Sequence, residues 1–354
     1  MDVINTGITV IGKRYYRNCI TSTNYEEIVH EDYKYNKNYD EDYCDYDETN
    51  SCFFIKEEGN NFVTQLKVAS MFYCFIIGKK GESKKKIECD TKTNITIPHE
   101  GKTGPVIVKG KNYASVDRAA SRIFELVEFG RYLTPFTHFF SIPANNEIIT
   151  QNFETFKSEV LHRCVGDRGI EDRLFQKPYK LHLTLSVIVI GDHDELDSLL
   201  GIFNEFKQSN EELFRESLRV HIKGLEYMND DPCEVRVLYG KVANELDSEK
   251  LQILANRLVA FLAEKRLISQ KDSKAVTLHM TLLNASFLSE QDLALDTAND
   301  VKDPKHFDCS NILKKFSDFD FGLLVVNEII LSKRHGTSRG SYYAKAATFK
   351  LGME

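Results

Sequence analysis

The chain has 354 residues, of which 42% are apolar and 11% aromatic, and it contains no tryptophan. This length leaves room for two domains, and the composition is that of an ordinary globular protein. A formal net charge of −7 argues against a general polyanion-binding protein, although charge is spread unevenly along the chain. No apolar run approaches the roughly 18 to 20 residues that span a bilayer, and we recognise no leader peptide, so we expect no membrane association.

The eight cysteines form no Cys-x-x-Cys pair and do not cluster with the histidines. A zinc site or a disulfide framework would show such spacing. We therefore expect reduced thiols, no metal, no cofactor, and a nuclear or cytosolic protein.

Residues 1–20 contain strand-forming residues around a glycine turn, cut off from other core-forming sequence. A segment of this kind cannot bury its own apolar side chains. It is either a docking arm that adds a strand to a partner or an arm that packs on its own protein. The residues of the docking alternative are Val10, Ile11, Gly12, Arg14, Tyr16 and Arg17.

Residues 21–60 predict an acidic flexible linker. Between residues 24 and 50 there are ten acidic residues, two lysines and six tyrosines, without aliphatic periodicity. Such a composition does not offset the entropy cost of ordering the backbone. We favour a solvated tether, with competition against nucleic acid for a basic surface as the alternative.

Residues 61–131 are locally basic, with twelve Lys and Arg against seven Asp and Glu between residues 62 and 130. Two glycines around two lysines, leading into a helix, form a turn whose backbone can approach phosphates closely. The expected elements are a strand (62–68), a short helix (70–75), the Gly-Lys-Lys-Gly turn (78–81), strands (94–98 and 105–110) and an amphipathic helix (113–129).

This order of elements around a Gly-x-x-Gly turn resembles a type I K homology (KH) domain. In that family the turn clamps the backbone of about four unpaired nucleotides, and an apolar groove receives the bases. The resemblance implies single-stranded RNA as the ligand, with single-stranded DNA as an alternative. The implied contacts are Gly78, Lys79, Lys80, Gly81, Ile76 and Ile77.

Residues 132–354 predict a second domain. The order strand, helix, signature strand occurs twice in it, which is the sequence trace of two pseudo-symmetric lobes. The expected strands are 136–143, 181–190, 218–225, 234–242, 275–283, 323–332 and 342–351, and the expected helices are 152–164, 194–207 and 248–265.

Two of those strands carry the same signature, Leu181-His182-Leu183-Thr184-Leu185 and Leu278-His279-Met280-Thr281-Leu282. Because side chains of a strand alternate between faces, each His shares a face with its Thr while the flanking residues enter the apolar layer. Two such strands side by side would place two imidazoles and two hydroxyls in one cleft. Imidazole accepts and donates protons near neutral pH, so the pair suits metal-free acid–base chemistry.

A third His-x-Thr, His335-Gly336-Thr337, lies in a Gly-rich polar stretch typical of a loop, and we discount it. Arg334, Tyr342 and Tyr343 border the same stretch. They are candidates to close over a bound phosphate, and a solvated surface loop is the alternative. A catalytic zinc would need three protein ligands, and we find no third at sensible spacing.

The paired signatures resemble the two-histidine (2H) phosphoesterase superfamily, the LigT-like fold of RNA end-processing phosphodiesterases. With the KH unit in front and the segments 175–178 and 224–232, the whole chain resembles the family of activating signal cointegrator 1 complex subunits. That resemblance implies a nuclear location with some cytoplasmic presence, and contact with the helicase subunit of the complex through the arm. It also implies links to transcription coactivation and to repair of alkylated nucleic acid.

The sequence thus predicts an α+β protein, with an N-terminal type I KH domain followed by a bilobal, pseudo-two-fold 2H phosphoesterase (LigT-like) domain. In one hypothesis it is an RNA phosphodiesterase with catalytic His182, Thr184, His279 and Thr281, the threonines binding nonbridging oxygens. In the other it is a catalytically silent RNA-binding scaffold. Which histidine is the acid and which the base stays open.

Overall fold

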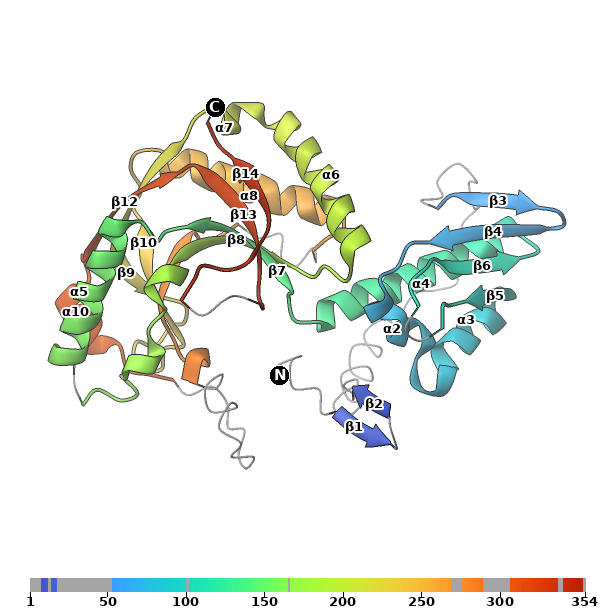
Figure 1. Cartoon of the computed structure of the whole chain (residues 1–354), viewed down its shortest axis with the longest axis horizontal. Helices are drawn as coiled ribbons and strands as arrows, with labels where there is room; N and C mark the ends of the chain where they lie inside the picture. The colour runs from blue at the N-terminus through green and yellow to red at the C-terminus, as the bar shows by residue number, and fades with distance from the viewer. Residues whose placement is uncertain are drawn as a thin grey trace. The chain divides into compact units, whose positions relative to one another are not determined.

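The structure is a computed structural model that divides into a unit from Met1 to Pro135 and a unit from Phe136 to Glu354 (Figure 1). None of the helices it describes is both long and apolar enough to cross a bilayer. The described residues are 53–99, 102–164, 166–268, 275–288, 306–336 and 340–352, together with the backbone alone at 8–11 and 14–17.

The predicted docking arm contains a short antiparallel pair, β1 (Ile8–Ile11) and β2 (Arg14–Arg17). Gly12, the side chains of the other docking candidates and residues 18–52 of the arm and linker lie outside the described residues. The docking role therefore stays a prediction.

The KH fold is present as predicted. From β4 onwards its elements follow the order strand, helix, helix, strand, strand, helix, and its antiparallel sheet, which also contains the edge strand β3 (Ile55–Glu58), has the order β3-β4-β6-β5. Helix α4 covers the sheet through the fully buried Val116, Ala120 and Ile123, which repeat at helical spacing. The bounds are β4 (Asn61–Leu66), α2 (Tyr73–Ile77), α3 (Glu82–Thr91), β5 (Thr93–Thr96), β6 (Val106–Gly110) and α4 (Tyr113–Leu133).

One strand of this sheet was not expected. Residues 55–58, which the sequence analysis placed in the flexible linker, form β3 (Ile55–Glu58) and pair with β4 from Ile55–Thr64 to Glu58–Asn61. Three of the four side chains of β3 are exposed, so this edge strand carries no apolar alternation. Cross-strand hydrogen bonds, which leave no signature in composition, order it.

The second unit is built on one antiparallel sheet with the order β12-β9-β10-β11-β8-β7-β13-β14 (Figure 1). Its strands are β7 (His138–Pro143), β8 (His182–Ile188), β9 (Leu218–Tyr227), β10 (Val237–Val242), β11 (His279–Asn284), β12 (Asp320–Val326), β13 (Glu328–Lys333) and β14 (Lys345–Lys350).

The sheet has two halves of equal construction, as the repeated strand–helix–signature order predicts. In one half α5 (Glu147–Arg163) connects β7 to β8, and in the other α8 (Ser248–Glu264) connects β10 to β11. The signature strands β8 and β11 lie next to each other at the centre. The remaining α-helices described are α6 (His193–Ser209), α7 (Glu211–Phe214) and α10 (Ser310–Phe316), of which α7 and α10 were not predicted.

A single apolar core holds both halves together. On α5, the fully buried Phe156 contacts the ring of Phe175 and, much further along the chain, the rings of Phe316, Phe319 and Phe321. On α6, Phe203 stacks on Phe140 of β7 and Phe349 of β14.

The expected single strand at 323–332 is in fact two strands. The strand is interrupted at Asn327, and β12 pairs with β9 at one edge of the sheet while β13 pairs with β7 and β14 near the other. The apolar run continues through this break, so hydrophobicity alone gives no boundary there.

Candidate active site and KH loop

The two signature strands meet at a single residue pair, Leu183 opposite Met280. Both side chains are fully buried and belong to the core. Because alternate residues of a strand face opposite ways, His182, Thr184, His279 and Thr281 all share the other face of the sheet. The structure therefore brings the four predicted residues together.

A loop segment before β8 fixes the position of the two halves of the sheet relative to each other. Phe175 forms a bridge with Leu283 of β11, and the backbone N–H of Gln176 donates to the carbonyl of Leu282 at 2.8 Å. Phe175 is only 2% exposed, so this junction is held by burial as well as by hydrogen bonds. β11 is therefore held beside the start of β8 over more than one residue pair.

The two imidazoles are held in the same way. Nδ1 of His182 lies 2.7 Å from the carbonyl oxygen of Lys180, and Nδ1 of His279 lies 2.7 Å from that of Thr277. A carbonyl can only accept, so each Nδ1 carries the proton and donates it. In the neutral rings Nε2 is then the unprotonated nitrogen, free to accept a proton, and it contacts no hydrogen-bonding group among the described residues.

Burial lowers the pKa of both imidazoles. The pKa of His182 falls from 6.5 to about 4, chiefly because burial disfavours the charged ring, with His279 and Lys180 adding positive charge. The hydrogen bond to Lys180 acts in the opposite direction. The pKa of His279 is also lowered by burial and partly restored by its bond to Thr277. Both rings are therefore neutral near pH 7 until an anion binds.

The surroundings of the two rings differ. Phe139 and Tyr343 flank His182, with ring centroids 5.3 Å and 5.4 Å away. His279 lies 5.0 Å from Tyr239, whose hydroxyl donates to Oε2 of Glu226. Burial, followed by the charge of Glu226, raises the pKa of Tyr239 to about 12, so its hydroxyl stays protonated. The sequence analysis named only Tyr343 of this group.

The three loop candidates have different positions. Tyr343 packs edge-on against His182 and lies beside the site. The Tyr342 hydroxyl donates instead to Oγ of the buried Ser141 at 3.0 Å, and the Arg334 guanidinium stacks over Phe136 at 4.5 Å. In this conformation the hydroxyl of Tyr342 is engaged with Ser141, and its role as a phosphate contact stays a prediction. Thr337 lies outside the described residues.

The KH loop has the backbone that close phosphate approach requires. Gly78 and Gly81 both have positive φ, 69° and 80°, and Lys80 between them has φ 54°. A Cβ at residue 78 would lie 2.2 Å from Oγ of Ser83, so glycine is needed for space as well as for conformation. Helix α3 begins directly after the turn and directs its N-terminal N–H groups there.

One predicted KH contact is wrong. Ile76 is fully buried and belongs to the core under the sheet, whereas Ile77 is 37% exposed. The two adjacent residues of α2 point in different directions because a helix advances about 100° per residue. Only Ile77 is accessible to a ligand.

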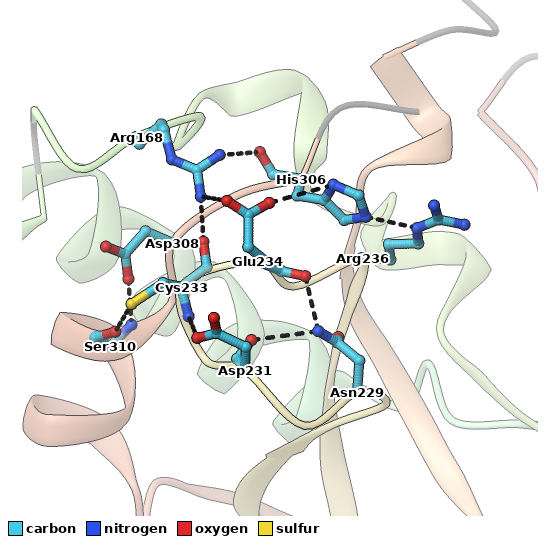
Figure 2. Close-up of polar contacts among 9 residues, drawn as sticks. All are labelled: Arg168, Asn229, Asp231, Cys233, Glu234, Arg236, His306, Asp308 and Ser310. Atoms are coloured by element: carbon cyan, nitrogen blue, oxygen red, sulfur yellow. Dashed lines mark hydrogen bonds and ion pairs between the residues drawn. The ribbon is translucent and has the colours of Figure 1, made fainter. Parts of the chain in front are cut away.

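A separate polar cluster closes the turn between β9 and β10 (Figure 2). Arg168 pairs with Glu234 at 2.8 Å and donates to the carbonyl of Cys233, and Glu234 also lies 3.4 Å from Nδ1 of His306. Nε of Arg236 donates to Nε2 of that ring at 2.7 Å. Three loops are tied together by these contacts. Within the described part of the chain, no group of three or more His, Cys, Asp or Glu is arranged to hold a metal ion.

Comparison with known proteins matches both units. A KH domain model matches residues 63–125, and a model described as AKAP7 2'5' RNA ligase-like domain matches residues 136–351. Activating signal cointegrator 1 complex subunit 1 of Mus musculus is 34% identical over 355 residues, which cover 97% of this chain and 98% of the mouse protein. An uncharacterized Schizosaccharomyces pombe protein is 26% identical over 156 residues, 43% of this chain and 68% of its own.

Solved structures resemble the chain more distantly. Escherichia coli LigT in its apo form covers 62% of this chain and 99% of its own, with a TM-score of 0.36 and 16% identity. Usb1 of Kluyveromyces marxianus with uridine monophosphate covers 62% and 98%, with a TM-score of 0.33 and 10% identity. The two family models and the mouse relative, not these distant structures, decide the assignment. The chain, with a KH domain followed by an AKAP7 2'5' RNA ligase-like domain, belongs to the family of activating signal cointegrator 1 complex subunit 1.

Proposed function

We propose that the chain is a metal-independent phosphodiesterase that acts on RNA ends or 2′,3′-cyclic phosphates, with His182 and His279 as acid and base. One observation carries the proposal. Two histidines from two halves of a pseudo-symmetric sheet have the same Nδ1 anchor, each at 2.7 Å, and share one face at the point where the halves join. The same hydrogen bond thus orients both imidazoles, as is required if both act on one substrate.

The chemistry follows from the tautomers. One neutral imidazole takes a proton from the attacking oxygen through Nε2, while the other, protonated when the phosphate binds, donates one to the leaving oxygen. A phosphate anion between the rings favours that protonation by attraction. Thr184 and Thr281 lie on the same face, and their hydroxyls have no hydrogen-bond partner among the described residues. They donate to the nonbridging oxygens, where charge grows in the transition state.

The KH domain would hold a single strand of RNA, or of DNA, whose end the phosphodiesterase site processes. The mouse relative is named as a complex subunit, and on this basis we propose that the chain joins the same kind of complex. Within that proposal the arm at residues 1–20 contacts the helicase subunit. The protein is mainly nuclear with some cytoplasmic presence, and it serves transcription coactivation and alkylation repair.

The test is hydrolysis of a 2′,3′-cyclic phosphate and of a 3′-tailed oligonucleotide. His182→Ala and His279→Ala should each abolish turnover with a circular dichroism spectrum and melting temperature close to those of wild type. His193→Ala is the matched control, because that imidazole is 83% exposed on α6, outside the site. Turnover retained by either site variant would refute the two-histidine mechanism.

The KH proposal has its own test. Lys79→Asp with Lys80→Asp should weaken single-stranded RNA binding and flatten its salt dependence, by about 0.7 in log–log slope for each phosphate that the turn no longer neutralises. Lys84→Asp with Lys85→Asp, one turn into α3, makes the same charge change outside the turn. If both double variants reduced the affinity equally, RNA would be attracted by the net charge of the domain and not held specifically by the Gly-Lys-Lys-Gly turn.

A second function has one observation in its favour. In the free protein both pKa values are depressed, so neither ring is a proton donor at neutral pH. A site that stays in this state binds phosphate through the hydroxyls of Thr184 and Thr281, because neither neutral ring has a free N–H, and it does not turn over. The chain would then be a catalytically silent RNA-binding scaffold. Phosphate binding without hydrolysis across a panel of cyclic and linear substrates would favour that function.

A further inference from the structure

The faces beside the two site histidines are chemically unlike, although the halves of the sheet have the same construction. The cross-strand partner of His182 is Pro143 of β7, and the partner of His279 is Lys241 of β10. Partners in antiparallel strands share a face, so Lys241 lies on the face that bears the imidazoles. At the cross-strand position, therefore, His279 has a cation as its neighbour and His182 has an apolar ring.

The Lys241 side chain lies across the neighbouring strand. A Cβ at Gly224 of β9 would be 3.0 Å from Cε of Lys241 and 3.7 Å from Nζ. Gly224 has φ +83°, so glycine is favoured there both by backbone conformation and by the space that the lysine stem occupies. The ammonium group is thus displaced from β11 towards β9, and adjacent strands lie about 4.8 Å apart.

Lys241 is an available cation. It is exposed, and it forms no ion pair or hydrogen bond with any described residue. The nearby carboxylates are engaged elsewhere: Glu226 accepts from Tyr239, while Asp320 and Glu245 bind the two nitrogens of His221. Lys223, the next outward-facing lysine on β9, is exposed and equally unpaired within the described chain.

We propose that Lys241, followed by Lys223, binds the backbone phosphate next to the reacting one, so that the substrate class is an oligonucleotide rather than a mononucleotide. This rests on the proposed phosphodiesterase function and adds the direction of the strand to it. The strand leaves the site over β10 and β9, past His279. On the His182 side the cross-strand partner is Pro143, and the cation that acts on His182 there, Lys180, already lies over the ring of Tyr343 at 4.8 Å.

The test compares two substrates, a mononucleoside 2′,3′-cyclic phosphate and a tetranucleotide that ends in the same group. Every variant is made in the full chain carrying Lys79→Asp and Lys80→Asp, so that binding at the KH loop does not obscure the result. Lys241→Gln should lower kcat/KM for the tetranucleotide about threefold to fivefold, the upper part of the range for an exposed charge pair. It should leave kcat/KM for the mononucleotide unchanged. Lys241→Arg should restore most of the kcat/KM.

The control is Lys314→Gln on α10. Lys314 is exposed and has no ion pair in the described chain, so this variant should change kcat/KM for neither substrate. If Lys241→Gln lowers kcat/KM equally for both substrates, the lysine binds the reacting phosphate and the proposed strand direction is wrong. If wild type turns over neither substrate, the phosphodiesterase proposal fails by itself. The affinity for a 3′-phosphorylated tetranucleotide then decides the inference: equal affinities of the Lys241→Gln and Lys314→Gln variants would overturn it.

Discussion

The depressed pKa of His182 is the prediction that tests the site most directly, because it can be measured whether or not the protein turns over substrate. The ring packs between Phe139 and Tyr343 and donates Nδ1–H to a backbone carbonyl. These contacts remove water from the imidazole and so disfavour its charged form. We perturb the site by lowering the pH, first in the free protein and then in the presence of inorganic phosphate.

The magnitude follows from the lowered pKa. A change from 6.5 to about 4 corresponds to roughly 3 kcal/mol of folding free energy, at about 1.4 kcal/mol per pKa unit. A histidine with a lowered pKa stays neutral in the folded state while the unfolded chain takes up a proton. The contribution is therefore fully present above about pH 6.5 and is lost as the pH falls towards 4.

The assay is an NMR titration of ring-labelled histidines, with His182→Gln to assign the resonance. We expect a midpoint near 4 in the free protein and a higher midpoint with phosphate, because the anion stabilises the imidazolium. His138 is the internal comparison. Its pKa is also lowered to about 4 by burial and by Lys333, but its partner on β8 is Ile188, at the opposite end of that strand from His182, so phosphate should not shift it. A free-protein midpoint at or above 6.5, or equal phosphate shifts for both rings, would refute the reasoning.

Three further predictions test other parts of the structure. Phe156→Ala removes a fully buried ring that contacts four others, so we expect thermal unfolding to show a loss of about 3–5 kcal/mol, and a loss under 1 kcal/mol would contradict the packing. His221→Gln should destabilise the protein most below about pH 6.5 and progressively less above it, as urea unfolding across pH can show. Burial lowers the pKa of His221, but hydrogen bonds to Asp320 and Glu245 raise it overall, and stability from a raised pKa is lost as pH increases. Gly78→Ala should weaken RNA binding more than Gly81→Ala, because both have positive φ but only the Cβ at 78 meets Ser83.

The chemistry of the site could be predicted from sequence because it depends on a local rule. In a strand the face of a side chain follows from its position, so His182 and Thr184 must lie together whatever the strand pairs with. The same holds for His279 and Thr281. Placing the two pairs side by side needed one further inference, the repeated order of elements, and the pairing of Leu183 with Met280 agrees with it.

The neighbours of the histidines could not be predicted in the same way. Tyr239 and Lys241 lie beside His279 because of the register between β10 and β11, which contains an irregularity after Leu238. One residue of slip would send both side chains to the apolar face. Hydrophobic patterning does not fix such an offset. Strand β3 and the break between β12 and β13 at Asn327 were missed for a related reason, since cross-strand pairing determines both.

The Nδ1 anchors of the two histidines depend on different parts of the molecule. The carbonyl of Thr277 that holds His279 belongs to a segment bound to α8 of its own half, since Asn256 and Gln252 hydrogen-bond the backbone of Val276. The carbonyl of Lys180 that holds His182 follows the segment that docks on β11 of the other half. Separation of the halves would therefore disturb the orientation of His182 before that of His279. Because both rings must face one phosphate, the contact between the halves controls whether the site is complete.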